Sequence, residues 1–130
     1  MKINLKNKTY LISAAADGIG FAIAKKIISA GGKVYISDIN KKKINEINKK
    51  YKNKIYATAM DCTNPAEIKN YFHKLKSLKK IDGLINNIGI AGPTKSLENI
   101  KIEEWEETIN TNLHSHFYYT KYSIPFLKKA

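Results

Sequence analysis

Short apolar runs alternate along the chain with longer segments of helical period. The runs lack strict alternation of apolar and polar residues, which is typical of strands buried on both faces. Four such runs are present: 9–14 (TYLISA), 33–38 (KVYISD), 54–60 (KIYATAM) and 82–87 (DGLINN). Helices are expected between and after them, over 18–30, within 39–54, from the cap residue Asn64 onward, and from about Ile102 past Tyr119.

Apolar spacing and cap residues support these helices. Ile19, Ala22, Ile23 and Ile27 recur at the spacing of one helical face and are expected to be its apolar side. Ile44, Ile47 and Tyr51 form such a stripe in the lysine-rich run 39–54, which therefore reads as an amphipathic helix. In NPAE (64–67) the Asn is a helix cap and the Pro suits the first turn. Trp105 and Ile109 are expected to pack against the rest of the domain.

The order of strands and helices predicts the fold class. Strands that alternate with helices of ten or more residues pair in parallel through right-handed crossovers. The sequence therefore predicts an α/β fold with a doubly wound, Rossmann-like parallel sheet that carries helices on both faces. No linker, repeat or low-complexity segment marks a second domain, so residues 1–130 are expected to form one domain.

The charge changes this picture little. The net charge is +12, but all 23 basic residues are lysines, scattered over several predicted helices, whereas a base-reading surface usually recruits arginine. Lys, Asn and Ile are abundant together, as in a chain with AT-rich coding bias, so we expect a solvated surface and no nucleic-acid partner. No apolar run reaches the ~20 residues of a membrane span, no signal peptide is evident, and one cysteine, Cys62, allows no internal disulfide. A cytoplasmic protein without a membrane partner is expected.

The loop SAAADGIG (13–20) is the first candidate site. It joins the first strand to the first helix, at the sheet edge where doubly wound folds bind ligands. Gly18 and Gly20 would let a diphosphate approach the helix N-terminus, whose amide groups favour an anion. Asp38 ends the second strand, where a carboxylate accepts hydrogen bonds from ribose hydroxyls and repels a 2′-phosphate. Together the loop and Asp38 predict dinucleotide binding, although two glycines alone would equally suit a plain turn.

Asp61 and the pair Asn86 and Asn87 each allow two interpretations. Asp61 follows the third strand and either reaches an adenine amino group or is a turn residue before the helix cap. Asn86 and Asn87 end the fourth strand and either hold a loop open over a cofactor or form a turn. His114 and His116 are two residues apart, so on a helix they face different directions and no shared metal is expected.

These motifs jointly resemble the short-chain dehydrogenase/reductase family. Its Thr-Gly-x-x-x-Gly-x-Gly motif is matched imperfectly by Ser13, Ala14, Gly18, Ile19 and Gly20, and its Asn-Asn-Ala-Gly motif resembles 86–89 (NNIG). The segment 103–117 is similar to the family's fourth helix. The resemblance implies strand order 3-2-1-4, a catalytic role with a local helix irregularity at Asn112, and cofactor contacts at Ser13, Ala14, Asp17, Gly18, Ile19, Gly20, Asp38, Ile39, Asp61, Cys62, Asn87, Ile88 and Gly89.

The sequence departs from the family pattern at three positions. Ala14 stands where the family has glycine, and Ile88 where it has a small alanine; these changes bear on the fit of the cofactor. Asp17 occupies a position that is often basic in family members that prefer NADP. With Asp38, it indicates that NAD is the cofactor and that NADP is less suited.

The family's Ser and Tyr-x-x-x-Lys residues are not found. None of the eight tyrosines is followed four positions later by a lysine. We therefore expect residues 1–130 to be the N-terminal half of a longer single-domain fold, with an exposed edge strand and marginal stability when isolated. The resemblance implies an NAD-dependent oxidoreductase of small-molecule alcohols or carbonyls that forms homo-oligomers through the fourth helix; the alternative is a non-catalytic dinucleotide-binding or interaction module.

Overall fold

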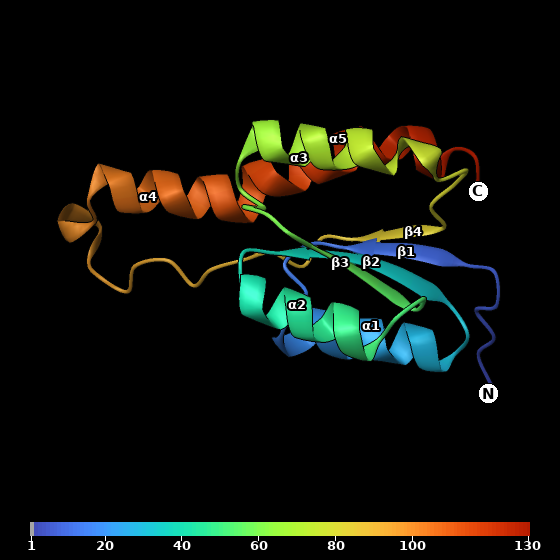
Figure 1. The fold of residues 1–130 in the computed structure, drawn as a ribbon. Coiled ribbons are helices and arrows are strands. Elements are labelled where there is room, and N and C mark those ends of the chain that lie inside the picture. The colour runs from blue at the N-terminus through green and yellow to red at the C-terminus, as the bar shows by residue number, and fades with distance from the viewer. Residues whose placement is uncertain (1) are drawn as a thin grey trace.

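A parallel four-stranded sheet forms the centre of the protein in the computed structural model, which describes residues 2–130 (Figure 1). Its order is β3-β2-β1-β4, and all three pairings are parallel. The predicted fold class and strand order are thereby confirmed. The strands are β1 (Thr9–Ile12), β2 (Lys33–Asp38), β3 (Ile55–Ala59) and β4 (Gly83–Ile85).

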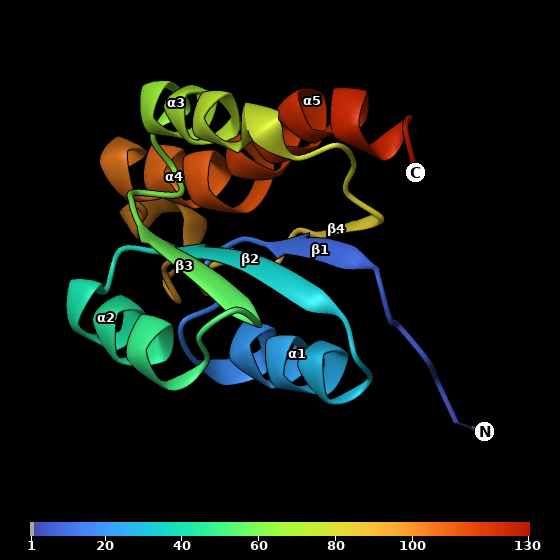
Figure 2. The ribbon, with the colours of Figure 1, turned by 45° about the vertical axis from the view of Figure 1, so that its right-hand side comes forward.

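Helices cover both faces of this sheet (Figures 1 and 2). The helices α1 and α2 lie on one face and α3 and α5 on the other, whereas α4 projects beyond the carboxyl ends of the strands. A π-helical segment joins α4 to α5, so that the predicted long helix is continuous but irregular. The bounds are α1 (Gly18–Ser29), α2 (Lys41–Lys50), α3 (Pro65–Lys74), α4 (Ile102–Ile109), the π segment η3 (Asn110–His114) and α5 (Ser115–Leu127), with short 3-10 turns at Leu75–Ser77 and Leu97–Asn99.

The strands β1, β2 and β4 contribute alternate residues to two apolar cores, and β3 contributes to the first of them. Ile12 on β1 packs in the core beneath α1 and α2, and its neighbour Leu11 packs in the core beneath α3 and α5. Both residues are fully buried, which confirms that β1 is covered on its two faces. Burying a side chain of this size stabilises the fold by about 1.5–3 kcal/mol. The two cores hold the sheet between its helix layers and so position the carboxyl ends of the strands.

The buried face of α1 agrees with the predicted one only in part. Ile27 is buried and Ile23 packs against the core half-buried, as predicted. Ile19 is 77% exposed and Ala22 is also exposed, whereas Gly20 and Ala24 face the core. The physical reason is the close approach of Gly20 to Asn87, which only a residue without a side chain allows. The apolar residues of this helix occupy too much of its circumference for periodicity alone to choose the face.

Trp105 on α4 does not pack against the domain as expected, because 56% of its surface is exposed. The predicted cap of α3 is confirmed: Asn64 Oδ1 accepts hydrogen bonds from the amides of Ala66 and Glu67, at 3.0 and 3.1 Å. None of the helices within residues 2–130 is long and apolar enough to cross a membrane.

Asp82 anchors the opposite end of the sheet, away from the candidate site. Its side chain is only 6% exposed; Oδ2 accepts from the Thr9 amide at 2.9 Å, and Oδ1 lies 3.2 and 2.9 Å from the ammonium groups of Lys8 and Lys80. Burial opposes ionisation of this carboxyl, but the Thr9 amide and the two lysines outweigh it and lower the pKa of Asp82. Its charge therefore stabilises the fold above the ordinary aspartate pKa of about 4.

Replacing this carboxylate is expected to lower stability in a pH-dependent way. Asp82→Asn should reduce the free energy of unfolding by about 2 kcal/mol at pH 7, since the Thr9 amide and the two lysines lose a charged acceptor. As the pH falls through the lowered native pKa, the unchanged protein loses the same contribution, so the difference between the two proteins should shrink. Urea unfolding at pH 7 and pH 3 measures this, and a difference that stays constant would contradict the assignment.

Candidate functional site

The loop between β1 and α1 has a backbone shape that brings it close to the sheet edge. Gly18, the first residue of α1, has φ +58°, and Ala14 has φ +51°, a region that favours glycine. Asp17 caps the helix: its Oδ1 accepts from the Gly18 amide at 2.8 Å. A side chain at Gly18 would meet no atom within 4 Å, so the approach to the helix N-terminus is open.

Asn87 and Ser13 lock this loop to the end of β4. The side-chain amide of Asn87 donates to the carbonyl oxygens of Ser13 and Ala14, at 3.1 and 2.8 Å. In return, Ser13 Oγ accepts from the backbone amides of Asn87 and Ile88, at 3.1 and 3.3 Å. Ser13 is fully buried, so these bonds are protected from water. Of the two interpretations of Asn87, the geometry favours the one in which it holds a loop.

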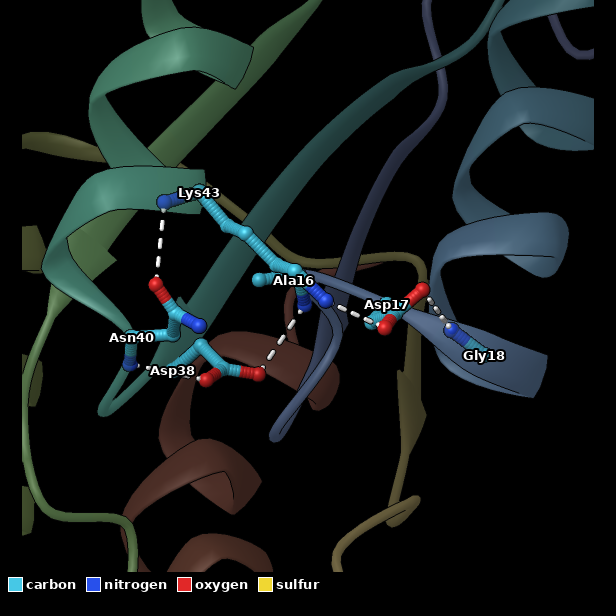
Figure 3. Close-up of polar contacts among 6 residues, drawn as sticks. All are labelled: Ala16, Asp17, Gly18, Asp38, Asn40 and Lys43. Atoms are coloured by element: carbon cyan, nitrogen blue, oxygen red, sulfur yellow. Dashed lines mark hydrogen bonds and ion pairs between the residues drawn. The ribbon is translucent and has the colours of Figure 1, made fainter.

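Asp38 connects the same loop to the end of β2 (Figure 3). Its Oδ2 accepts from the Ala16 amide at 3.1 Å and its Oδ1 accepts from the Asn40 amide at 3.0 Å. The carboxylate is half-buried and also lines a large cleft. The loop and the carboxylate that the sequence places 20 residues after Gly18 are therefore in direct contact.

A cleft of about 670 Å³ lies over the carboxyl ends of β1 to β4, beneath α4. It is bordered by Asp38 and Asp61 from the sheet side and by three glutamates of α4, which makes it acidic although the chain has net charge +12. Its predicted members are Ala14, Asp38, Ile39, Asp61, Cys62 and Ile88; its other members are Thr63, Ile90, Glu103, Glu106, Glu107, Asn110 and Thr111.

At the floor of the cleft, one carboxylate oxygen of Asp61 accepts hydrogen bonds, and the thiol of Cys62 is chemically unreactive. Asp61 Oδ1 accepts from the amide and hydroxyl of Thr63, at 2.9 and 2.7 Å, as a turn residue does. The thiol of Cys62 donates to Ser37 Oγ at 3.3 Å, and Ser37 shares a 2.6 Å hydrogen bond with the buried Tyr119 hydroxyl. Burial raises the pKa of Cys62, so its thiol stays protonated at neutral pH and acts as an apolar wall.

Asn112 ties the loop after β4 to the helix above it. It lies in the π segment, and its side-chain amide forms two hydrogen bonds with the backbone of Ile90, both at 2.8 Å. His116 Nε2 lies 2.8 Å from the carbonyl oxygen of Ile88. Gly89 sits between these contacts, where an added Cβ would lie 3.5 Å from Asn112 Oδ1. The irregular helix thus positions the loop that forms one rim of the cleft.

Seven residues expected to contact a cofactor do not line the cleft: Ser13, Asp17, Gly18, Ile19, Gly20, Asn87 and Gly89. Asp17 points toward α2, where its carboxylate pairs with Lys43 Nζ, and Ile19 is exposed at the start of α1. Gly18 and Gly20 also lie at the helix N-terminus and do not line the cleft. The predicted residues therefore divide between the cleft and the rim formed by the loop.

The polar wall that α4 contributes to the cleft was not predicted from the sequence. The residues that face the cleft from this helix and the π segment, 103, 106, 107, 110 and 111, follow the spacing of one helical face. The polar stripe is visible in the sequence, but the sequence pattern does not indicate that α4 extends over the ends of the strands. Among residues 2–130, no group of three or more His, Cys, Asp or Glu side chains is placed to hold a metal ion.

Ala14 offers a direct test of the loop geometry. Replacing it by glycine removes the cost of a left-handed conformation, about 1–2 kcal/mol, against a smaller loss from the more flexible unfolded chain. Ala14→Gly should therefore raise the free energy of unfolding by about 0.5–1 kcal/mol, measured by urea denaturation. The matched change Ala22→Gly, at an exposed helical position, should instead lower it by a similar amount. Equal destabilisation by both changes would contradict the loop conformation.

Comparison with known proteins places the chain in a family. The short chain dehydrogenase family model matches residues 8–130. The 7alpha-hydroxysteroid dehydrogenase of Bacteroides fragilis is 28% identical over 130 residues, covering 94% of this chain and 49% of that protein. The 2-dehydro-3-deoxy-D-gluconate 5-dehydrogenase of Bacillus subtilis is 31% identical over 120 residues, covering 91% and 47%. The chain spans about half the length of these curated relatives.

Solved structures give the same result. The ligand-free aldohexose dehydrogenase of Thermoplasma acidophilum superposes with a TM-score of 0.81 at 29% identity, covering 97% of this chain and 46% of that one. The glycine-containing loop, the carboxylate at the end of β2 and the asparagine clamp therefore occur in a chain whose fold and sequence both match one family. The chain belongs to the short-chain dehydrogenase family.

Proposed function

We propose that this chain is the dinucleotide-binding part of an NAD-dependent oxidoreductase that acts on a small alcohol or carbonyl compound. The single observation that carries the proposal is the contact between Asp38 and the loop before α1, 3.1 Å from Asp38 Oδ2 to the Ala16 amide. It supports the proposal because the carboxylate that would bind the ribose lies beside a helix N-terminus suited to a diphosphate.

The residues present fit such a cofactor. The amides of Ile19 and Gly20 in the first turn of α1 have no intrahelical acceptor, and no atom lies within 4 Å of a Cβ added at Gly18, so an anion would be favoured there. Asp38 would hold the adenosine ribose, and the cleft bordered by Ile39, Asp61 and Ile88 offers an apolar slot with a polar floor for adenine. Ser13, Gly20 and Asn87 would contribute to cofactor binding indirectly, by holding the loop before α1 in its shape.

The cofactor supplies hydride transfer to or from the substrate carbon when bound. Asn112 would hold the rim of the site through Ile90, as its two hydrogen bonds do here. We propose that the groups that move the proton come from chain beyond residue 130, as the family resemblance implies. The residues that select the alcohol or carbonyl substrate would also lie in that part of the chain.

Charge supports NAD over NADP in this proposal. The cleft carries five carboxylates, from Asp38, Asp61 and three glutamates of α4, which disfavour the additional charge of a 2′-phosphate. The overall net charge of +12 would favour any dinucleotide by long-range attraction, but it does not distinguish the two.

Calorimetric titration of the chain with NAD⁺ and NADP⁺ tests the proposal. We expect saturable one-site binding of NAD⁺ and at least about tenfold weaker binding of NADP⁺, a difference of about 1.4 kcal/mol. Absence of NAD⁺ binding would contradict it. A protein extended beyond residue 130 that binds NAD⁺ but turns over no alcohol or ketone in a broad panel would favour the alternative of a non-catalytic module.

We also propose that α4 and α5 pack against a second copy of the protein. Apolar side chains gather along this continuous helix and are exposed: Ile102, Trp105, Leu113, Phe117 and Ile124. Light scattering should show an oligomer that dissociates in Phe117→Lys but persists in the control Ile3→Lys, on the N-terminal arm. A monomer at all concentrations would contradict this.

The buried free thiol of Cys62 suits a reducing compartment, and we propose a cytoplasmic location.

A further inference from the structure

An ion pair joins the loop before α1 to the first turn of α2 (Figure 3). Asp17 caps α1 through Oδ1, which accepts from the Gly18 amide, and its Oδ2 pairs with Lys43 Nζ. The pair is on the surface, with side chains 74% and 41% exposed. Pairs this exposed contribute little to stability, so its role is unlike that of the buried Asp82 cluster.

The position of Lys43 is set independently of that pair. The Lys43 amide donates to Asn40 Oδ1 at 3.1 Å, and the Asn40 amide donates to Asp38 Oδ1 at 3.0 Å. Asp38 in turn accepts from the Ala16 amide, next to Asp17 in the chain. Lys43 therefore belongs to a closed circuit of contacts around the carboxylate proposed to bind ribose.

Space is available beside this circuit. A cavity of about 280 Å³ lies between α1 and α2, outside the main cleft, and both Asp17 and Lys43 line it. Phe21 and Tyr51 form its apolar side, while Glu46 and Lys50 border it from α2. A phosphate on a ribose held by Asp38 would come into the neighbourhood of Lys43, whose ammonium group has no other ion-pair partner among residues 2–130.

We propose that Asp17 sets the cofactor preference indirectly, by holding Lys43 so that its ammonium group is not free to bind the 2′-phosphate of NADP. This inference rests on the proposed function and adds a second specificity residue, Lys43. The Asp17 carboxylate raises the pKa of Lys43, and Lys43 lowers that of Asp17, so both stay charged at neutral pH. Released from Asp17, Lys43 would offer a charge-assisted hydrogen bond to a phosphate.

Direct repulsion of the phosphate by Asp17 is the competing explanation, and a double-mutant cycle separates the two. Asp17→Asn removes the charge but keeps an oxygen for the cap, since asparagine is as good a helix cap as aspartate. Lys43→Met removes the cation but keeps a long side chain. Under repulsion alone, Asp17→Asn would improve NADP⁺ binding equally in the unchanged chain and in the Lys43→Met variant. Under our proposal, the improvement requires Lys43.

The experiment is calorimetric titration of the chain, both single variants and the double variant with NADP⁺ and NAD⁺. We expect Asp17→Asn to tighten NADP⁺ binding by about three- to fivefold, the most that so exposed an ion pair can withhold, and the double variant to lose that gain. The control Lys42→Met, an exposed neighbour in the same helical turn, should change neither affinity. The inference is overturned if Asp17→Asn has no effect on NADP⁺, or if its gain survives Lys43→Met, while NAD⁺ still binds. Failure of the unchanged chain to bind NAD⁺ would overturn the proposed function, and this inference with it.

Discussion

Gly20→Ala is expected to abolish measurable cofactor binding and to lower the free energy of unfolding by about 2 kcal/mol. The added Cβ would overlap Asn87 Nδ2, and it would lie 2.8 Å from Asn87 Cγ and 3.0 Å from Ala15 Cβ. The two contacts with Asn87 are sterically impossible, so the Asn87 amide must leave its place. It would then lose its hydrogen bonds to the Ser13 and Ala14 carbonyl oxygens, which hold the loop in shape.

Gly18→Ala is the matched control for that change. Gly18 has φ +58° but nothing within 4 Å of an added Cβ, so alanine there costs only the left-handed conformation, about 1–2 kcal/mol. Urea unfolding should therefore show a loss of stability in both variants. Calorimetric titration with NAD⁺ should show weakened but measurable binding in Gly18→Ala, whose Cβ lies toward the proposed diphosphate position, and none in Gly20→Ala. Normal binding by Gly20→Ala would show that the Asn87 clamp does not shape the site.

Asp38→Ala should weaken NAD⁺ binding by one to two orders of magnitude. A hydrogen bond to a charged group contributes about 1.5–3 kcal/mol, and this carboxylate is proposed to accept from the ribose. The Ala16 and Asn40 amides would also lose their acceptor, so the loop would be less ordered before binding. Asp38→Asn keeps one acceptor oxygen without the charge and should bind NAD⁺ with intermediate affinity.

Titration with both dinucleotides checks this prediction. The control is Glu46→Ala, which removes an exposed carboxylate of α2 outside the main cleft and should leave NAD⁺ affinity within about twofold. An Asp38→Ala protein that binds NAD⁺ as tightly as the unchanged chain would remove Asp38 from the site. If Asp38→Ala lowers the affinity for NAD⁺ more than the affinity for NADP⁺, the result would support a role of Asp38 in discriminating between the two dinucleotides.

The sheet could be predicted from sequence because its signals are local. Each strand is a short apolar run, and caps or apolar stripes mark helices, as at Asn64 and along Ile44 and Ile47. The strand order came from family resemblance, since periodicity does not state which strands are neighbours. The structure confirms that order.

The details that failed depend on tertiary contacts. The sequence indicates apolar residues on α1, but the choice of the Gly20 face over the Ile19 face depends on Asn87, which is 67 residues away from Gly20. Trp105 was expected inside and is exposed, because α4 projects past the sheet. The orientation of Asp17 toward Lys43 could not be foreseen either, because it requires the relative placement of α1 and α2.

The central claim is that the loop 13–20, Asp38 and the cleft over the strand ends form one dinucleotide site. NMR titration of the ¹⁵N-labelled chain with NAD⁺ tests this claim most directly. The account predicts saturable amide shifts concentrated at 14–20, 38–40, 61–63 and 88–90, with residues around Asp82 unaffected. Shifts that concentrate away from these segments, or no shifts at saturating NAD⁺, would contradict it.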